Sequence, residues 1–343
     1  MGRILVTGGL GFIGSHTVVE LQEKGREVLI IDDLSNSRPE VLDGIAAITG
    51  VYPEFFKIDL KDKAEVFEFM AGQKIDGVIH FAASKAVGES VEKPLLYYEN
   101  NIAAMVYLLQ AMLANGVRSF IFSSSCTVYG QADDLPITED APVKSAESPY
   151  GNTKQIGEEI LQDLAKVEDL QVIALRYFNP IGAHESGHIG ELPLGVPQNL
   201  IPFVTQTAAG IREQLSVFGD DYPTPDGTAV RDYIHVVDLA KAHIAALERL
   251  LSGKNRSGME FFNVGTGKGS SVLEVIRAFE EVSGTRLNYK IVGRREGDIT
   301  AAYADTSLAN RELGWKAQLD LRDALRSAWK WQNRQVPGSG EEE

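Results

Sequence analysis

The sequence predicts an α/β fold with a doubly wound parallel sheet. Short apolar segments alternate with longer amphipathic segments over the first half of the chain, and short connections join them. This order is typical of parallel strands linked by crossover helices. The first apolar segment also leads directly into a glycine-rich turn that opens a helical pattern. Together these observations indicate a Rossmann-type sheet, followed by a smaller C-terminal substrate-binding domain.

The first strand, RILV, is followed by the turn TGGLGFIG, whose glycines have the spacing GxxGxxG. Gly8 permits a tight turn, Gly11 lets the backbone approach a pyrophosphate, and Gly14 lets the next helix pack closely on the strand. The helical pattern HTVVELQEKG that follows Gly14 would then point free N–H groups at the phosphates, and Phe12 and Ile13 of the turn are expected to contact the cofactor. A plain glycine-rich turn without a ligand is the alternative.

The second strand, EVLIID, ends in Asp32, about 20 residues after the glycines. A carboxylate there accepts hydrogen bonds from the adenosine ribose and repels a 2′-phosphate, so the sequence favours NAD over NADP. The third strand, EFFKID, ends in Asp59, which is placed to meet the adenine edge. Asp59 could also cap the helix DKAEVFEFM, and the two roles are compatible.

The strands GVIHFAA and RSFIF follow, separated by a long amphipathic helix from about Pro94 to Asn115. RSFIF ends at Ser123–Ser125, and the first two residues of SPYGNTK mark the N-cap and first position of a helix that runs to about Val167. Ligands of such sheets bind beyond the carboxyl ends of the strands. Along that edge we expect the glycine turn with Asp32, Asp59, Phe81, Ser125 and Tyr150.

Tyr150 and Lys154 are four residues apart on this helix, so they share one side of it. An ammonium beside a phenol favours the phenolate and lowers the pKa of the tyrosine. Tyr150 could then take a proton from a substrate hydroxyl that Ser125 holds in line. The pair alone is a weak signal because this spacing arises by chance, and serines at strand ends are usually turn formers. Its position on the ligand-binding edge strengthens the interpretation.

After the sixth strand, VIALRYFN, the composition changes, and residues 180–227 contain many prolines and glycines. We expect RDYIHVVDLAKAHIAALERL to return to a helix, MEFFNVG to add a strand, and SVLEVIRAFEEV with RREGD to complete the cap. The expected domains are therefore an NAD-binding domain at 1–178, to which the chain returns around 234–264, and a substrate-binding region at 179–336. The acidic segment 337–343 is expected to be disordered.

Composition excludes several classes of protein. The net charge of −15 argues against a nucleic-acid binder or a basic membrane-surface protein. Cys126 is the single cysteine, so no internal disulfide is possible and a reducing compartment fits. The chain opens on strand-like residues without a signal-peptide pattern, and no apolar run could span a bilayer. We expect a cytoplasmic protein that binds neither nucleic acid nor membrane.

Three other candidate positions are given structural interpretations. Cys126 has no histidine partner in the sequence pattern and is expected to be a small buried thiol. His235 is expected to form structural hydrogen bonds. His184 and His188 flank Glu185, but we expect no metal site there.

The motifs taken together resemble a known family. TGGLGFIG, HFAASKAVGES, SSSCTVYG, SPYGNTK, RYFNPIGAH, RDYIHVVDLA and RREGD are similar to those of the extended short-chain dehydrogenase/reductases, specifically the UDP-glucose 4-epimerases. The resemblance runs from Arg3 to about Gln332. It implies tightly held NAD, UDP-glucose and UDP-galactose as substrates, and an isomerase of carbohydrate and galactose metabolism. It also suggests a homodimer formed by the helices around 94–115 and 148–167.

The resemblance implies a mechanism and a role for each matching residue. Tyr150 removes the proton of the sugar 4-hydroxyl while C4 gives a hydride to the nicotinamide, and the 4-keto sugar turns over and takes the hydride back on its other face. Ser125 orients the 4-oxygen, and Lys154 binds the nicotinamide ribose and lowers the pKa of Tyr150. Further cofactor contacts would be made by Asn36, Leu60, Ala82, Lys85, Asn100, Ser123, Tyr177 and Phe178. The nucleotide-sugar pocket would contain Asn179, Asn199, Leu200, Phe218, Arg231, Tyr233, Arg295, Asp298 and Ala302.

One position departs from the pattern of epimerases restricted to plain hexoses. Ala302 stands where these enzymes resemble one another in having a bulky tyrosine, and Tyr303 follows it. The smaller side chain implies room for an N-acetyl group at C2 of the sugar. The sequence therefore predicts activity on UDP-N-acetylglucosamine and UDP-N-acetylgalactosamine too, unless Tyr303 or another neighbour fills the space.

Two other functions were weighed. A nucleotide-sugar 4,6-dehydratase needs an acid and base for eliminating water, and in that family Asp-Glu follows the active-site hydroxyl residue. Cys126-Thr127 follows Ser125 here, which argues against dehydration. A non-catalytic NAD-binding regulator would keep the fold, but the intact Ser125, Tyr150 and Lys154 argue against it.

Overall fold

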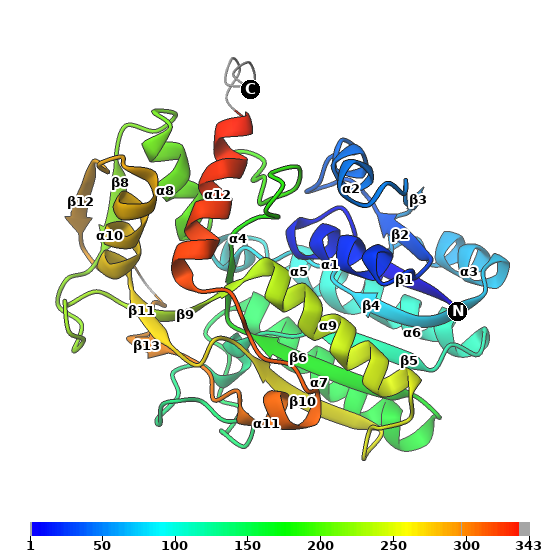
Figure 1. Ribbon diagram of the computed structural model, residues 1–343. Coiled ribbons are helices and arrows are strands. Elements are labelled where there is room, and N and C mark those ends of the chain that lie inside the picture. The colour runs from blue at the N-terminus through cyan, green and yellow to red at the C-terminus, as the bar shows by residue number, and fades with distance from the viewer. Residues whose placement is uncertain (1, 296, 336–343) are drawn as a thin grey trace.

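A central parallel sheet organises the computed structural model, which describes residues 2–295 and 297–335. Its seven strands have the order β10-β6-β5-β4-β1-β2-β3, and all neighbours are parallel (Figure 1). The predicted doubly wound sheet is therefore confirmed. The strands are β1 (Arg3–Thr7), β2 (Val28–Asp32), β3 (Glu54–Lys57), β4 (Ile75–His80), β5 (Ser119–Ser123), β6 (Gln171–Tyr177) and β10 (Met259–Val264).

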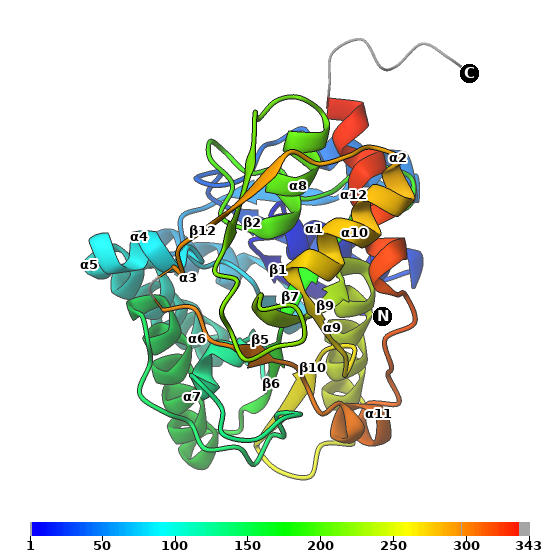
Figure 2. The same cartoon turned by 90° about the vertical axis from the view of Figure 1, so that its left-hand side faces the viewer.

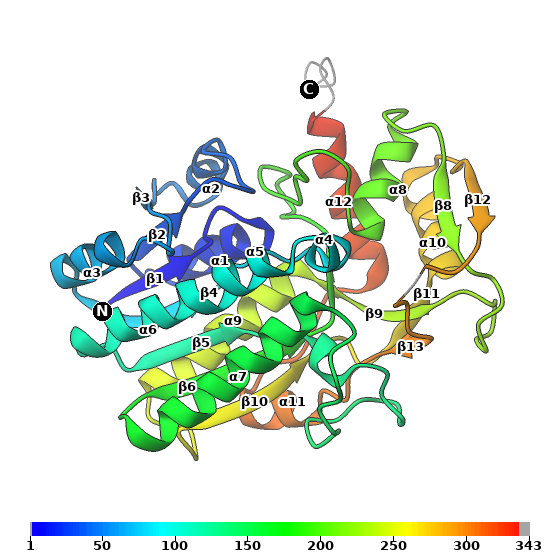
Figure 3. The ribbon, with the colours of Figure 1, turned by 180° about the vertical axis from the view of Figure 1, so that it is seen from behind.

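Helices cover both faces of this sheet. Successive strand residues point to opposite sides, and apolar side chains on both sides are buried under helices. Ile4 and Val6 of β1 pack into one core, and Leu5 packs into the other. The first core is closed by α1 (Phe12–Glu23), α2 (Val41–Thr49) and α9 (Val236–Leu251). The second, on the face seen in Figure 3, is closed by α3 (Lys63–Gly72), α6 (Ala104–Ala114) and α7 (Pro149–Val167).

The strands end together at one edge of the sheet. Thr7 pairs with Ile31 of β2 and with His80 of β4, and Ser123 of β5 pairs with Leu175 of β6. The loops that follow these strands therefore share the carboxyl edge, where the sequence places the ligand site.

A second region lies beyond this edge, at the left of Figure 1, and Figure 2 looks straight at it. Its core combines side chains of its helices and strands and includes Val204, Val217, Phe279 and Leu325. Its strands are β7 (Asn179–Ile181), β8 (Leu215–Phe218), β9 (Val230–His235), β11 (Gly269–Ser271), β12 (Tyr289–Val292) and β13 (Ala301–Ala302). Its helices are α8 (Leu200–Ala208), α10 (Val272–Ser283) and α12 (Leu321–Gln335).

This region contains a four-stranded sheet around β9 and a two-stranded sheet. Strand β9 pairs with β11, β13 and β7, and β8 pairs with β12. The chain then returns to the central sheet through α9 and β10. The expected division at residue 178 stays a prediction, and the acidic segment 337–343 lies outside the described residues.

Two sequence-based expectations about local structure are wrong. The segment RDYIHVVDLAKAHIAALERL is not one helix, because its first residues form strand β9 and α9 begins at Val236. Strand β9 pairs with β7 and β13, which are only three and two residues long and lie far away in the sequence. The sequence near β9 therefore contains no pattern that predicts a strand. Asp59 does not cap α3: Asp62 does, and its side chain accepts hydrogen bonds from Ala64 N and Glu65 N.

The long helix expected from about Pro94 to Asn115 is divided. Helix α5 (Pro94–Tyr98) continues through a π-helical segment, Glu99–Ala103, into α6. A π turn adds a residue to the helical turn and changes which side chains face the sheet edge. It brings Asn100 and Asn101 towards the loop that follows β4. The shorter elements α4 (Val87–Glu92), α11 (Ser307–Glu312) and the 3-10 turn Cys126–Tyr129 complete the chain.

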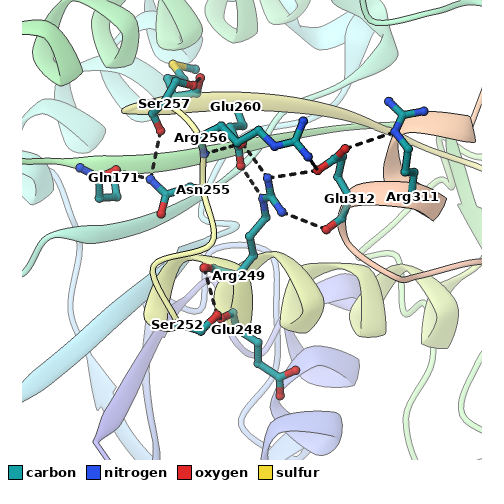
Figure 4. A network of polar contacts seen from close by, with 11 residues as sticks. Gln171, Glu248, Arg249, Ser252, Asn255, Arg256, Ser257, Glu260, Arg311 and Glu312 are labelled. Carbon is teal, nitrogen blue, oxygen red and sulfur yellow. Dashed lines mark hydrogen bonds and ion pairs between the residues drawn. The ribbon is translucent and has the colours of Figure 1, made fainter.

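A charged network fastens the opposite edge of the sheet (Figure 4). Arg249 at the end of α9 contacts Glu260 of β10 through Nε at 2.6 Å and Nη2 at 2.9 Å. Glu312 of α11 lies 3.5 Å from Arg249 Nη2 and 2.9 Å from Arg256 Nη2. The network therefore holds α9, β10 and α11 together, far along the strands from the candidate site. Among residues 2–295 and 297–335, no helix combines the length and the apolar character needed to cross a membrane.

Candidate active site

The glycine turn after β1 brings the backbone close to its neighbours. Gly8 has a φ of +68°, and a Cβ there would lie 2.7 Å from the backbone N of Ala82. A Cβ on Gly14 would lie 2.2 Å from the carbonyl oxygen of Gly8. Helix α1 then begins at Phe12, followed by Ile13, with no side chain capping its N-terminus. Its first N–H groups are therefore available to an anion such as a pyrophosphate.

Asp32 joins this turn to the loop after β2. Its carboxylate accepts hydrogen bonds from Leu10 N at 3.1 Å, Leu34 N at 3.0 Å and Ser37 Oγ at 2.7 Å. Burial raises the pKa of Asp32, and these hydrogen bonds lower it. Asn36 lies exposed in the same loop. The Asp32 carboxylate therefore already stabilises the turn through these hydrogen bonds, and the predicted contact with the ribose would be a further one.

Two loops and the π-helical segment meet around Lys61. Its Nζ lies 3.1 Å from Asp59 Oδ2 and 3.3 Å from Asn100 Oδ1, and Asn100 donates to Ser84 Oγ at 3.0 Å. Leu60 between them is buried. The structure thus brings the predicted adenine-side residues Asp59 and Asn100 together through a lysine that the sequence interpretation missed. Its only signal was a charged side chain directly after a predicted strand end.

Asn101 is a second position that the sequence interpretation missed. It is 5% exposed, and its Nδ2 donates to Ser84 O at 2.9 Å and to Thr153 Oγ1 at 3.0 Å. Its Oδ1 accepts from Ser84 N at 2.8 Å. Asn101 therefore fixes the loop after β4 against helix α7, which carries the catalytic candidates. No local pattern distinguishes it from Asn100 beside it.

Lys154 points at the end of β5. Its Nζ donates to the carbonyl oxygen of Ser123 at 2.7 Å, and the hydroxyl of Ser123 donates to Tyr177 OH at 3.0 Å. Phe81 and Tyr177 share an aromatic neighbour, since the ring of His243 lies 4.6 Å from Phe81 and 6.1 Å from Tyr177. These predicted cofactor residues from β4, β5, β6 and α7 therefore form one contiguous surface at the carboxyl edge.

Tyr150 and Ser125 face each other at this edge. Ser148 begins α7 by accepting a hydrogen bond from Gly151 N at 3.1 Å, and this cap sets the direction in which Tyr150 and Lys154 project. The Nζ of Lys154 lies 5.9 Å from the centroid of the Tyr150 ring. Tyr150, Lys154 and Ser125 are all buried. The catalytic candidates are thus assembled as the helical spacing predicts.

The pKa of Tyr150 differs from the expectation. Burial raises it well above its usual value, Tyr177 raises it further, and Ser125 lowers it. Burial also lowers the pKa of Lys154 to about 8. In the protein alone, burial therefore dominates the pKa of Tyr150, and the lowering effect of Lys154 stays a prediction.

The nearby cysteine and histidine behave as structural groups. Cys126 is half-buried, so the expected buried thiol is found only in part; desolvation still raises the pKa of the thiol to about 12, which makes it a poor nucleophile at neutral pH. His235 accepts a hydrogen bond from Val237 N at 3.1 Å and contacts Ser327 Oγ at 3.1 Å, which confirms its structural role. Within 2–295 and 297–335, no cluster of three or more His, Cys, Asp or Glu side chains is arranged to hold a metal.

The predicted nucleotide-sugar residues come from four strands, two loops and the first residue of α8. Arg231 of β9 and Arg295 both approach Asp298, with Nη2 to Oδ1 distances of 3.8 Å and 2.8 Å. Arg295 also lies 5.5 Å from the ring centroid of Phe218, at the end of β8. These four side chains form one cluster, whereas Asn179 in β7 and the buried Tyr233 in β9 line the strands beside it. Guanidinium groups in such a cluster suit a diphosphate.

Glu191 connects the cofactor side to the sugar side. Its Oε1 lies 3.3 Å from Lys85 Nζ and accepts a hydrogen bond from Asn199 Nδ2 at 2.6 Å. Asn199 precedes α8, which begins at Leu200. Lys85, expected near the pyrophosphate, is therefore paired with a residue of the second region. Glu191 stands in a glycine-rich loop and carries no sequence signal.

Ala302 lies beside the catalytic edge. It is 3% exposed in β13 and packs in a small apolar cluster with Val128, Phe178 and Cys126. Tyr303 points elsewhere: a Cβ on Gly269 would lie 3.1 Å from its ring. The ring of Tyr303 therefore lies next to Gly269, and the side chains around Ala302 are those of the apolar cluster.

Comparison with known proteins extends these findings. Residues 4–265 match the family model described as "NAD dependent epimerase/dehydratase family". A "UDP-glucose 4-epimerase" of Haemophilus influenzae is 51% identical over 336 residues, covering 98% of this chain and 98% of that protein. A crystal structure of the UDP-glucose-4-epimerase from Stenotrophomonas maltophila with bound NAD and formylated UDP-arabinopyranose is similar, with a TM-score of 0.94, 50% identity, and coverage of 97% and 98%. One from Bifidobacterium longum with NAD+ and UDP has a TM-score of 0.93, 48% identity, and coverage of 97% and 98%.

Proposed function

The chain belongs to the NAD dependent epimerase/dehydratase family, among the UDP-glucose 4-epimerases, and on this premise we propose that it interconverts UDP-glucose and UDP-galactose. The observation that carries the proposal is the assembly of Ser125, Tyr150 and Lys154 at the same edge of the sheet as the glycine turn. A dehydratase would need a further acid after Ser125, where Cys126 stands instead.

The residues around the glycine turn fit NAD. The uncapped N-terminus of α1 offers N–H groups to a pyrophosphate, and a Cβ on Gly8 or Gly14 would occupy space close to that turn. Asp32 would hold the adenosine ribose, and Lys154 with Tyr177 would lie beside the nicotinamide end. When bound, NAD supplies a reversible hydride acceptor and, in its oxidised form, a positive charge. We expect the purified protein to contain NAD rather than NADP, which mass spectrometry of the denatured protein would decide.

Tyr150 moves the proton of the sugar 4-hydroxyl in this proposal. Burial keeps its phenol protonated in the protein alone, so a positive charge must offset burial before Tyr150 can accept a proton. The Lys154 ammonium lies on the same side of α7 but does not offset burial in the protein alone, so the positive charge of oxidised NAD would have to add to it. Ser125 orients the 4-oxygen, and Tyr150 returns the proton after the keto sugar has turned over.

The nucleotide provides the binding energy that the mobile hexose cannot. Arg231 and Arg295 would bind the diphosphate, displacing part of their present contact with Asp298. Phe218 beside Arg295 offers a ring for the uracil, and Asn199 a polar contact. Contacts remote from C4 hold the substrate while the sugar turns over.

Product analysis tests this function. We expect UDP-galactose to yield UDP-glucose, and the reverse, with no net change in added NAD. A product of lower mass by one water would indicate dehydration instead. Binding of NAD without turnover of either sugar would favour the non-catalytic regulator.

We also propose that the pocket accepts N-acetylated sugars. Ala302 is small, and the ring of Tyr303 lies beside Gly269. The variant Ala302→Tyr should reduce turnover of UDP-N-acetylgalactosamine about tenfold or more, since overfilling a packed site costs about 1–3 kcal/mol. Turnover of UDP-galactose serves as the control and should barely change. Absence of N-acetylated turnover in the unaltered enzyme would refute the broad pocket and leave the epimerase function standing.

A homodimer is the assembly we propose, formed by the helices α5, α6 and α7. They lie together on one outer face of the protein (Figure 3), and Leu95 at its margin is 81% exposed. Exposed apolar side chains on such a face favour a second copy. Sedimentation of the protein and of a Leu95→Asp variant would test this. The single cysteine agrees with the reducing cytoplasm as the compartment.

A further inference from the structure

A buried ion pair lies directly behind the candidate active site. It joins Glu158 of α7 to Arg176 of β6, and the two side chains are 4% and 5% exposed. Arg176 donates from Nε to Glu158 Oε1 at 2.9 Å and from Nη2 to Oε2 at 2.7 Å. A bidentate contact of this kind is directional as well as strong. The pair therefore sets how α7 sits against β6.

Ser124 extends this contact to the end of β5. Its hydroxyl donates to Glu158 Oε1 at 2.6 Å. Side chains alternate along extended backbone, so the neighbours Ser123 and Ser125 face the other way, into the site. Glu158 thus holds Ser124, and the residues on either side of it, Ser123 and Ser125, contact the catalytic candidates.

The far side of the network is anchored as well. Arg176 Nη1 donates to Tyr129 OH at 3.0 Å, and Tyr129 OH donates to Asn263 Oδ1 at 2.7 Å. Asn263 Nδ2 donates to the carbonyl oxygen of Ile137 at 2.9 Å. Both charged groups of this hydrogen-bond network, Glu158 and Arg176, have partners, so contacts from β5 and from β6 fix the position of Glu158.

Glu158 is also the carboxylate nearest in sequence to Lys154 on the same helical face. It follows Lys154 by one turn, as Lys154 follows Tyr150. Burial lowers the pKa of Lys154 to about 8, and the charge of Glu158 opposes this shift. The other groups that face Lys154 are Tyr150 on α7, His80 on β4 and, through Ser123, Tyr177 on β6. Among these groups, Glu158 is the acid that favours the ammonium.

We propose that Glu158 is a positioning residue: through Ser124 and Arg176 it holds the strand end bearing Ser123 and Ser125 against the helix face bearing Tyr150 and Lys154. Its carboxylate also keeps a negative charge one helical turn from the Lys154 ammonium. This inference rests on the proposed epimerase function. It assigns to Glu158 no contact with substrate or cofactor.

The test is the variant Glu158→Gln, which keeps the shape of the side chain but removes its charge and one acceptor. We expect kcat to fall about ten- to a hundredfold, as a small misplacement of catalytic groups does. The alkaline limb of the pH profile should move to lower pH, because Lys154 loses its proton more readily without the carboxylate. The fraction of protein purified with NAD should also fall.

Glu260→Gln is the matched control. It breaks a comparably buried bidentate pair with Arg249 at the opposite edge of the sheet (Figure 4). Both variants should lower Tm, because each removes the carboxylate that pairs bidentately with a buried arginine, although Arg249 keeps a longer contact with Glu312 at 3.5 Å. Only Glu158→Gln should change kcat, the pH profile and the NAD content.

The double variant Glu158→Gln/Arg176→Met separates stability from positioning. It removes the unpaired cation, so Tm should recover while kcat stays low. Recovery of kcat together with Tm, or a Glu158→Gln profile that superimposes on that of the unaltered enzyme, would overturn the proposal. If the unaltered protein epimerises no UDP-hexose, the proposed function fails. The NAD content of Glu158→Gln relative to Glu260→Gln then decides the positioning role alone.

Discussion

Replacement of Gly14 by alanine tests whether close contact between α1 and the glycine turn is required. The added Cβ would lie 2.2 Å from the carbonyl oxygen of Gly8 and 2.9 Å from the Cα of Gly9. Real Cβ contacts essentially never fall below 3.0 Å, so α1 must move away from the turn. The clashing atoms belong to the backbone, and no change of rotamer can relieve them.

The magnitude follows from two opposing effects. Overpacking a rigid site typically costs about 1–3 kcal/mol. Alanine in place of glycine in a helix recovers about 0.4–1 kcal/mol by restricting the unfolded chain. We therefore expect Gly14→Ala to lower the free energy of unfolding by about 1–2 kcal/mol and the NAD content of the purified protein severalfold.

Urea unfolding and mass spectrometry of the bound cofactor measure the two effects. The control is Gly72→Ala at the end of α3, where a Cβ meets nothing within 4 Å. That variant should be at least as stable as the unaltered protein and should keep its NAD. If Gly14→Ala matches the control in both measurements, the turn does not need close packing and the argument for a cofactor cradle fails.

Two other predictions concern the catalytic base and the buried histidines. Tyr150→Phe should keep NAD and stability but lose at least about a hundredfold in turnover, because the packing surface survives and the proton acceptor does not; near-normal turnover would refute the mechanism. Burial lowers the pKa of His16 and His80 to about 3, so below their unfolded value near 6.5 the unfolded chain takes up protons that the folded protein excludes. Stability should therefore fall as the pH is lowered from 7 to 5, by about 2 kcal/mol for each histidine. His16→Leu should reduce this dependence by about that amount in urea unfolding at the two pH values, and an unchanged dependence would contradict the assignment.

Much of the fold could be predicted from the sequence because its signals are local. Apolar runs predicted the strands of the central sheet, and the glycine turn predicted the start of α1. The spacing of Tyr150 and Lys154 placed them on one side of α7, and the Ser148 cap was visible as a serine before proline. Strand β9 was missed because its partners are short segments distant in the chain.

The tertiary structure decided what depends on contacts between distant residues. Lys85 meets Glu191, whose position 106 residues away no periodicity could indicate. The π-helical segment turns Asn100 and Asn101 towards Ser84, and this follows from packing rather than from helix propensity. Spacing alone suggested a lowered pKa for Tyr150, whereas burial raises it, because desolvation depends on everything packed around the phenol. The sequence by itself thus determined which candidate catalytic residues lie at the sheet edge, and only the folded chain determined their burial and their partners.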